Sequence, residues 1–275
     1  MSANPESETR VRRIIYVIRY LILREMKKNL STTYIIRRLR ALGASAFSTR
    51  EFQDLFGVRP EEAYRVLHRL AGADAVRRIR QGLYVLVAHD DEVLGHSLYL
   101  GTRLVEPSYV AFWSALHFRG WTEQAPRVVF IANRRRSGTR AVGAHRFRLV
   151  RVSPRRFFGY EEAREGPFAF PVAEPEKAIV DALCAPGLSG GAGLVASALG
   201  EALPSLDLER LLEYGTRMGS RTLCSRLGYL LERSGAAAEP IREAASAAYV
   251  KLDPAGPRAG RFVARWRIID NLGGA

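Results

Sequence analysis

The sequence has little of what would place it in a membrane or in an oxidising compartment. Its best apolar stretch, Ile14 to Leu23, is interrupted by Arg19 and is far shorter than the roughly 20 residues that a membrane span needs. Acidic residues precede this stretch and a charged run follows it, which does not fit a signal peptide. Only two cysteines occur, Cys184 and Cys224, too few for a disulfide framework. We therefore expect a cytoplasmic protein without membrane contact.

Recognisable catalytic and metal-binding patterns are also absent. The histidines share no metal-ligand spacing with one another or with the cysteines; they are His68, His89, His96, His117 and His145. Three residues, Glu174, Lys177 and Asp181, share one face of a predicted helix and could hold Mg²⁺ as in a nuclease. Helix capping and the helix dipole are an adequate explanation for the acids. We expect no metal, no cofactor and no enzymatic activity, with an Mg²⁺-dependent nuclease as the alternative.

Lysine is scarce too, and the positive charge is carried by arginine. Lys and Arg together number 42 against 28 acidic residues, a net charge of +14, and just four of the 42 are lysine. Arginine pairs well with phosphates and guanine edges, which favours a nucleic-acid partner; codon usage or a hot habitat is the alternative cause. Two segments concentrate the charge: Arg10 to Arg40 has ten basic residues and one acid, and Gln124 to Tyr160 has ten arginines and no acid.

The first third of the chain reads as helices followed by a hairpin. Residues 1–45 are expected to form a basic helical extension, with one amphipathic helix over 8–29 and a second from Ser31 to near Leu42. Within residues 46–90, Ser48 and Glu51 form a capping-box pattern that opens a helix to Phe56. Gly57 makes a turn, Pro60 opens a helix to about Gly72, and residues 75–86 have a hairpin pattern. This order is that of a winged helix-turn-helix domain.

The helix that Pro60 opens fits the major groove in such a domain, and the hairpin, or wing, places cations beside phosphates. A buried stripe of Ala63, Val66, Leu67 and Leu70 would leave the opposite helix face to read bases. The candidate DNA-binding residues are Arg50, Arg59, Glu61, Tyr64, Arg65, His68, Arg69, Arg77, Arg78, Arg80 and Gln81. A winged helix used for protein contacts is the alternative, and the three wing arginines argue against it.

Residues 91–275 are expected to form a second, mixed α/β domain, so that the whole chain is α+β. The patterns predict a helix over 108–120, strands over 127–132, 145–152, 155–160 and 168–172, a helix over 173–183, four later helices near 194–203, 207–218, 220–234 and 240–248, and a last strand over 262–269. A second basic surface is predicted from Arg134, Arg135, Arg136, Arg140, Arg146 and Arg148. It either extends a DNA footprint, meets an acidic partner, or is a solvated loop.

Five sequence blocks of the second half occur together. They are Glu106–Gln124 (EPSYVAFWSALHFRGWTEQ), Phe157–Glu161 (FFGYE), Ala173–Leu183 (AEPEKAIVDAL), Arg226–Glu232 (RLGYLLE), and Leu252–Arg258 (LDPAGPR) followed by Arg265–Ile269 (RWRII). With the winged-helix pattern, they resemble the AbiEi family of antitoxins, in the family's order, over about residues 47–270. The basic extension before residue 46 is longer than the family pattern leads us to expect.

The resemblance implies a two-domain antitoxin of a type IV toxin–antitoxin system. Its winged helix would repress the shared operon by binding double-stranded operator DNA with inverted repeats. Its C-terminal domain would counteract a nucleotidyltransferase-like toxin, a role linked to abortive infection by bacteriophages. A stand-alone winged-helix regulator without a toxin is the alternative within the same resemblance.

Overall fold

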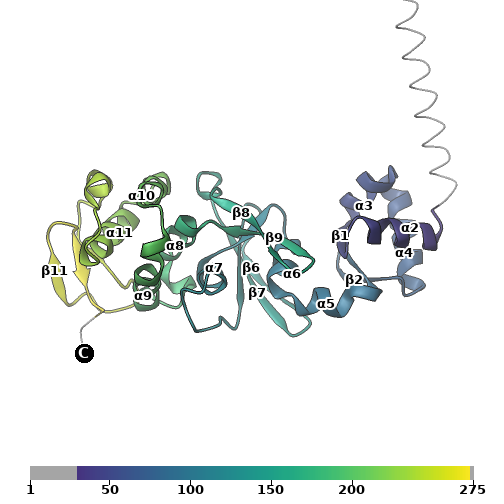
Figure 1. The fold of residues 1–275 in the computed structure, drawn as a ribbon, viewed down its shortest axis with the longest axis horizontal. Coiled ribbons are helices and arrows are strands. Elements are labelled where there is room, and N and C mark those ends of the chain that lie inside the picture. Colours follow the sequence, from purple (N-terminus) through teal and green to yellow (C-terminus); the bar gives the residue numbers. More distant parts are fainter. Residues whose placement is uncertain (1–29, 273–275) are drawn as a thin grey trace, which may run out of the picture. The chain divides into compact units, whose positions relative to one another are not determined.

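The computed structural model describes residues 30–272, which form a mixed α+β protein, as predicted (Figure 1). The chain divides into two compact units, unit 1 up to Gly95 and unit 2 from His96 onwards. Over the described residues, no helix combines the length and the apolar character needed to cross a bilayer. The helix predicted over residues 8–29 lies outside the described residues.

Unit 1 contains a small antiparallel sheet, and its helices precede, separate and follow the strands along the chain. Its elements are α2 (Thr32–Ala41), β1 (Ala46–Ser48), α3 (Thr49–Phe56), α4 (Pro60–Gly72), β2 (Val76–Arg80), β3 (Leu83–Leu86), the 3₁₀ helix η1 (Val87–His89) and α5 (Asp90–Gly95). The strand order is β1-β3-β2, with Ala46 opposite Val85 and Arg77 opposite Val85 on the other side.

Local sequence signals set the boundaries of α3 and α4. The Ser48 amide donates to Glu51 Oε2 at 2.6 Å, and the Glu51 amide donates to Ser48 Oγ at 3.1 Å, so the predicted capping box is confirmed. Gly57 ends α3 in the left-handed region, at φ 62°, where glycine carries no steric penalty. Pro60 stands in the first turn of α4, where its missing N–H is harmless.

The predicted boundary between an extension over residues 1–45 and the following domain needs correction at α2. Ile35 and Leu39 of α2 are fully buried in the same core cluster as Phe52 of α3 and Leu67 of α4. The apolar stripe of α2 therefore completes the core of unit 1. The resemblance begins only near residue 47, which suggested an extension before it. The apolar positions of this segment must nevertheless be buried, and the α3–α4 pair supplies the surface.

Unit 2 is built on a six-stranded mixed sheet with the order β6-β7-β5-β4-β9-β8. Its first elements are α6 (Ser97–Arg103), β4 (Ser108–Val110), α7 (Phe112–Phe118), β5 (Val129–Asn133), β6 (Gly138–Val142), β7 (His145–Arg151), η2 (Pro154–Arg156), β8 (Tyr160–Glu165) and β9 (Phe168–Ala173). β7 runs parallel to β5 and β4 runs parallel to β9, whereas the other pairs are antiparallel.

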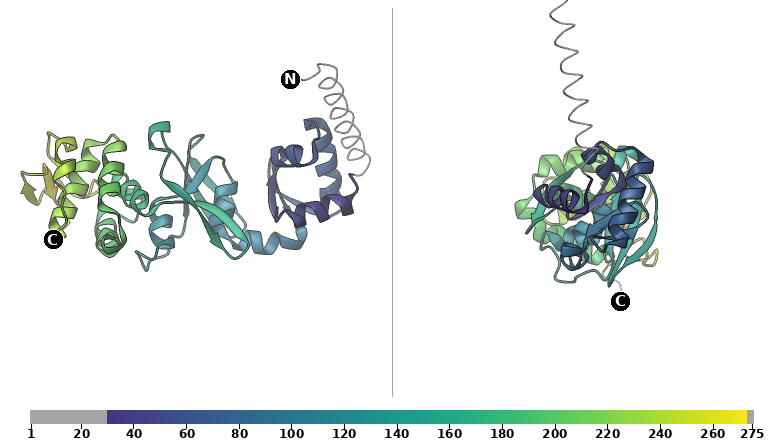
Figure 2. Two further views of the ribbon diagram at one scale, coloured as in Figure 1. Left: turned by 45° about the horizontal axis from the view of Figure 1, so that its top comes forward. Right: turned by 90° about the vertical axis from the view of Figure 1, so that its right-hand side faces the viewer.

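The rest of unit 2 is mainly helical. Its elements are α8 (Pro175–Cys184), η3 (Pro186–Leu188), α9 (Ala192–Ala202), η4 (Leu203–Ser205), α10 (Leu208–Arg217), α11 (Arg221–Arg233), η5 (Glu239–Ala244), β10 (Val250–Lys251), β11 (Arg261–Val263) and β12 (Ile268–Asp270). Figures 1 and 2 show the helices α8 to α11 gathered between the large sheet and a small sheet of β10, β12 and β11. α8 is the central helix, buried along almost its whole length.

Two predicted elements of unit 2 begin differently in the structure. The helix predicted over 108–120 is a strand, β4, followed by the shorter helix α7. The strand predicted over 155–160 is wrong: the 3₁₀ helix Pro154–Arg156 occupies its start, and β8 begins only at Tyr160. Proline lacks a ladder donor and fixes φ, which favours a turn over a strand at this point.

Other differences concern short or exposed elements. β6 was not predicted; it is an exposed edge strand without an apolar face, so it leaves no alternating pattern to read. The helix predicted over 240–248 is the 3₁₀ helix η5, and the last predicted strand is two strands, β11 and β12. The remaining predicted strands and helices of unit 2 are present with boundaries shifted by a few residues.

Candidate nucleic-acid interface

One face of α4 is free of the core of unit 1. Its exposed residues are Glu61, Tyr64, Arg65, His68 and Arg69, and the opposite residues Ala63, Val66, Leu67 and Leu70 are buried, as the predicted stripe requires. Tyr64 is 53% exposed. Large aromatic side chains are more often buried, so an exposed one can mark a contact with a partner. The face therefore offers an aromatic ring, two cations and an imidazole to a partner.

The loop before α4 adds an exposed arginine at the start of the helix and is anchored to the core of unit 1. Val58 is buried in the core, whereas Arg59, the N-cap residue of α4, is exposed. Arg50 is exposed in the first turn of α3. Arg69 is different, because its Nη2 donates to the Leu30 carbonyl at 2.5 Å. Arg69 thus holds the chain entering α2 against the end of α4.

The β2–β3 hairpin carries the three predicted wing arginines, and they have different surroundings. Arg77 forms an ion pair with Asp90 at 2.8 Å. Arg80 donates from Nη1 to the Gln81 carbonyl at 2.8 Å, next to the exposed Gln81 at the turn. Arg78 is exposed, and its side chain has neither a hydrogen bond nor an ion pair with any residue between 30 and 272. Arg78 is therefore the hairpin cation most available to an anion.

The structure adds arginines that were not among the predicted contacts. Arg37, Arg38 and Arg40 of α2 are exposed, and α2 belongs to the core of unit 1. The basic segment Arg10 to Arg40 was a visible signal for them, but its assignment to an extension separated it from the winged-helix pattern. Arg38 and Arg40 also lie in the last helical turn, where cations stabilise the helix dipole.

In unit 2, the run Arg134–Arg136 is a loop between β5 and β6, as predicted, and the buried Asn133 organises it. Asn133 Oδ1 accepts from the amides of Arg135 and Arg136 at 2.9 and 2.8 Å, and its Nδ2 donates to the Arg136 and Val150 carbonyls. The Arg135 guanidinium donates to the Glu106 carbonyl. Part of this basic run therefore serves to hold the loop in place.

The six arginines predicted as a second basic surface do not share one face of the sheet. Arg148 lies opposite Thr139 and Arg146 opposite Ala141, so these two arginines share a face. Arg140 lies opposite the buried Phe147 and projects from the other face, because residues directly opposite in a ladder project to the same side. The prediction of a single surface is corrected to Arg146 and Arg148 on one face.

The helix face considered for Mg²⁺ is buried inside unit 2. Lys177 is 0% and Asp181 1% exposed, and the two side chains form an ion pair. Tyr109 of β4 donates its hydroxyl to Asp181 Oδ2 at 3.0 Å and accepts from Lys177 Nζ at 3.0 Å. Burial raises the pKa of Asp181, and Lys177 and Tyr109 act in the opposite direction. The arrangement is that of a buried ion pair with a shared hydroxyl.

The remaining acid of that set has another partner. Glu174, the N-cap residue of α8, accepts a hydrogen bond of 2.5 Å from the Tyr214 hydroxyl. Burial, with this bond, raises the pKa of Tyr214 to about 12. Across residues 30–272, His, Cys, Asp and Glu do not gather in groups of three that could hold a metal ion.

Comparisons with known proteins bear on the fold alone. The chain matches no protein family and no curated protein. It is similar to a solved structure, the RV2827C protein from Mycobacterium tuberculosis, with a TM-score of 0.50 and 13% sequence identity, over 85% of this chain and 89% of that one. The similarity extends over both units of the chain.

Proposed function

We propose that unit 1 is a winged helix-turn-helix domain that binds double-stranded DNA, and that the chain is a transcriptional regulator. The observation that carries this proposal is the exposed face of α4 with Tyr64, Arg65 and His68, on the same small domain as the exposed Arg78 of the hairpin. A helix of this length fits a major groove, and hairpin cations suit the flanking phosphates.

The charges divide into two roles on this proposal. Arg65 and His68 on the outer face of α4 read base edges, since arginine forms two hydrogen bonds to guanine. Arg78 and Arg80 on the hairpin, with Arg50 and Arg59 near the start of the helices, neutralise phosphates. Arg77 and Arg69 contribute less, because Asp90 and the Leu30 carbonyl already bind them.

We expect the double variant Arg78→Ala/Arg80→Ala to bind every duplex more weakly. The logarithm of the binding constant falls linearly with the logarithm of the salt concentration. Each lost phosphate contact makes this slope shallower by about 0.9, because fewer counterions are released. Fluorescence anisotropy of a labelled random-sequence duplex, measured from low to high salt, gives the slope. Arg65→Ala should instead weaken discrimination at particular base pairs of a selected site, by about 1–3 kcal/mol.

The matched control is Arg258→Ala/Arg261→Ala, which removes the same charge from exposed positions of unit 2. If the control lowers the slope as much as the hairpin variant does, the effect is one of net charge and the hairpin has no special part in it. Unchanged binding of the hairpin variant would overturn the assignment of unit 1 to DNA.

We further propose that the regulator is an antitoxin that counteracts a nucleotidyltransferase-like toxin. The five AbiEi-like sequence blocks support this role, and they all lie in unit 2. Arg146 and Arg148, exposed on one face of β7, are the residues we assign to an acidic partner or to additional DNA.

The antitoxin role predicts that a toxic nucleotidyltransferase is encoded next to this chain. Its expression should arrest growth, and co-expression of this chain should restore growth. Arg146→Ala/Arg148→Ala should lose part of the rescue if these arginines meet the partner, while operator binding stays intact. A neighbouring reading frame that is harmless when expressed alone would instead favour a stand-alone regulator.

A further inference from the structure

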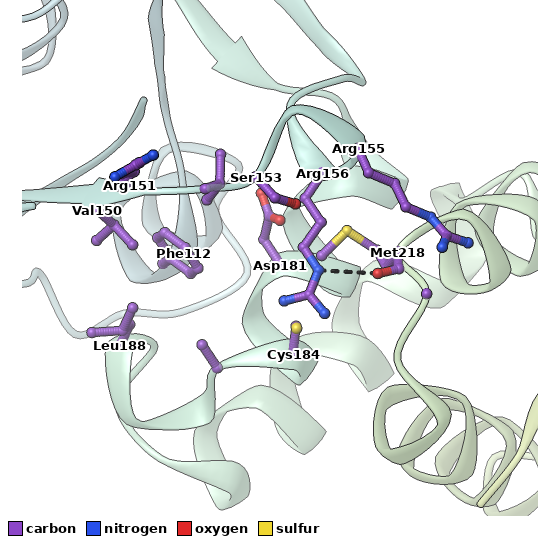
Figure 3. Close-up of a pocket in the computed structure, with 13 residues that line it drawn as sticks. Phe112, Val150, Arg151, Ser153, Arg155, Arg156, Asp181, Cys184, Leu188 and Met218 are labelled. Atoms are coloured by element: carbon purple, nitrogen blue, oxygen red, sulfur yellow. Dashed lines mark hydrogen bonds between the residues drawn. The ribbon is translucent and has the colours of Figure 1, made fainter. Parts of the chain in front are cut away.

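Unit 2 contains a pocket beside the end of β7, at the loop that carries η2 and against the end of α8 (Figure 3). Its volume is about 470 Å³, which lies within the range of small-molecule binding sites. All the residues that line it belong to unit 2. Neither the proposed DNA contacts of unit 1 nor Arg146 and Arg148 take part in it.

Three arginines line the pocket, Arg151, Arg155 and Arg156. Arg155 and Arg156 lie at one end, and Figure 3 shows Arg151 at the other end, beside Val150. None of them forms an ion pair within 4 Å with a carboxylate anywhere in residues 30–272. Asp181 also lines the pocket, but Lys177 pairs with its carboxylate. The positive charge of the pocket lining is therefore available to an anion.

The protein backbone holds two of these guanidinium groups in place. Arg156 Nε donates to the Met218 carbonyl at 3.0 Å, and Figure 3 shows the rest of its guanidinium group directed toward Cys184. Arg155 Nε donates to the Arg217 carbonyl at 3.1 Å. A single Nε bond leaves the terminal nitrogens of each group with donors to spare.

Gly219 makes the position of Arg155 possible. Its φ is +63°, and a Cβ atom there would come within 2.7 Å of Arg155 Cζ. A side chain at residue 219 would thus meet both backbone strain and the guanidinium group. The glycine at residue 219 therefore leaves the space in which the Arg155 guanidinium group is held at this end of the pocket.

The opposite end of the pocket has an apolar surface beside Arg151. Phe112, Val150 and Leu188 line it, and Figure 3 shows them on the side of the pocket away from Arg155. Phe112 has φ +54°, an uncommon conformation for an aromatic residue, and such conformations cluster at ligand sites. An aromatic and aliphatic wall suits a flat apolar group, while the arginines suit an anion.

We propose that this pocket binds a small molecule that joins a phosphate group to a flat ring, in the manner of a nucleoside diphosphate. Arg155 and Arg156 bind the phosphate through charge-assisted hydrogen bonds. The ring lies against Phe112, Val150 and Leu188. Arg151 lies beside Val150 and adds positive charge at the end that holds the ring. The site does not depend on the DNA-binding proposal, and its test uses no DNA.

The test is isothermal titration calorimetry of the full chain with four probes, ADP, GDP, CDP and UDP, and with inorganic phosphate and the parent nucleosides. At least one diphosphate should bind, and phosphate alone and the matching nucleoside should bind at least tenfold more weakly, because each supplies half of the contacts. Failure of all four diphosphates to bind would overturn the proposal. A nucleoside that binds as tightly as its diphosphate would also overturn the proposal, because the arginines would then contribute nothing to binding.

Arg151→Ala is the cleanest variant, because the Arg151 side chain has no hydrogen bond or ion pair with residues 30–272 that folding could need. It should weaken the diphosphate severalfold, because it removes one positive charge from the pocket lining and leaves the two phosphate-binding arginines in place. Arg156→Lys keeps the charge but loses the forked donor, and it should also weaken binding.

The matched control is Arg146→Ala, on the same strand and equally exposed, but absent from the pocket. Binding should be unchanged in it. If Arg146→Ala and Arg151→Ala weaken binding equally, the attraction is a general one to a basic protein, and the pocket assignment is wrong.

The rate at which a thiol reagent labels Cys184 tests whether the ligand binds in this pocket. Cys184 lines the pocket and is half-buried, whereas Cys224 is buried, and the chain has no other cysteine. Burial raises the pKa of the Cys184 thiol, so labelling with N-ethylmaleimide is measured above pH 8. The diphosphate that binds should slow labelling of Cys184 severalfold. Binding without protection of Cys184 would place the ligand elsewhere and overturn the proposal.

Discussion

Replacement of Lys177 by methionine should destabilise unit 2 by about 3–5 kcal/mol, because it leaves a buried carboxylate without its cation. Lys177 and Asp181 are both almost completely buried and lie one helical turn apart on α8. The Lys177 ammonium also lies 5.4 Å from the ring of Tyr109 and 5.0 Å from that of Phe158. Methionine has a similar length and fills much of the space, so the expected loss is electrostatic.

All three tryptophans, Trp113, Trp121 and Trp266, lie in unit 2. Tryptophan fluorescence during urea unfolding therefore reports the stability of unit 2 and is silent on unit 1. The control is the double variant Lys177→Met/Asp181→Leu, which removes both charges. Replacement of a buried pair by apolar residues is often neutral, and the Tyr109 hydroxyl left without partners costs about 1–3 kcal/mol. The double variant should be more stable than the single one.

The loss in Lys177→Met should depend on pH in a defined direction. Burial raises the pKa of Asp181, and the lowering effect of Lys177 is absent from the variant. Unfolded aspartate releases its proton near pH 3.9, whereas the folded variant keeps it to higher pH. The unfolded state then binds fewer protons, so stability falls as pH rises, by up to about 1.4 kcal/mol per pH unit within that window. The difference from wild type should thus be smallest near pH 4. A loss below 1 kcal/mol that is equal at pH 4 and pH 7 would contradict this account.

Signals within a few residues of each other predicted unit 1 well. Ser48 with Glu51, Gly57 and Pro60 each fix a boundary through a contact or a backbone angle that involves neighbouring residues. The buried stripe of α4 follows from helical spacing alone. By contrast, the burial of α2 depends on which surface its apolar stripe meets, and the family pattern, which begins only near residue 47, left α2 outside the domain.

The sites that sequence patterns missed depend on contacts across long separations. Tyr109 and Lys177 are 68 residues apart, and their hydrogen bond gives the supposed metal-binding face a structural explanation. Arg156 reaches the Met218 carbonyl 62 residues away, so the pocket exists only once the sheet and α10 are assembled. The acid-free segment Gln124 to Tyr160 drew attention to these arginines, but the residue pattern could not divide them among a loop, two sheet faces and a pocket.

Replacement of Gly228 by alanine should destabilise unit 2 by about 3 kcal/mol, although alanine is the better helix former. Gly228 lies in α11 directly against the ring of Trp266, which is completely buried, and a Cβ atom at residue 228 would overlap that ring. The Trp266 indole also donates to Glu232 Oε2 at 2.8 Å, so the ring cannot move without losing this bond. Overpacking of a tight core costs about 1–3 kcal/mol, and the fixed ring places this substitution at the upper end.

The same substitution at Gly200 is the control, and it should change the stability of unit 2 in the opposite direction. Gly200 is exposed in α9, and a Cβ atom there would meet nothing within 4 Å. Gly200→Ala should therefore stabilise unit 2 by about 0.5–1 kcal/mol, the usual gain from removing a helical glycine. Both variants keep all three tryptophans, so urea unfolding followed by fluorescence compares them directly.

A double-mutant cycle shows whether the ring is the cause. Trp266→Phe alone should destabilise unit 2, because it removes buried apolar surface and the bond to Glu232. In the Trp266→Phe background, Gly228→Ala should cost less than it does in wild type, because the smaller ring leaves room for the methyl group. A coupling energy of at least 0.5 kcal/mol in that direction is expected for residues in contact. Strict additivity, or a stabilising Gly228→Ala, would show that α11 and the C-terminal segment do not pack as closely as the structure has them.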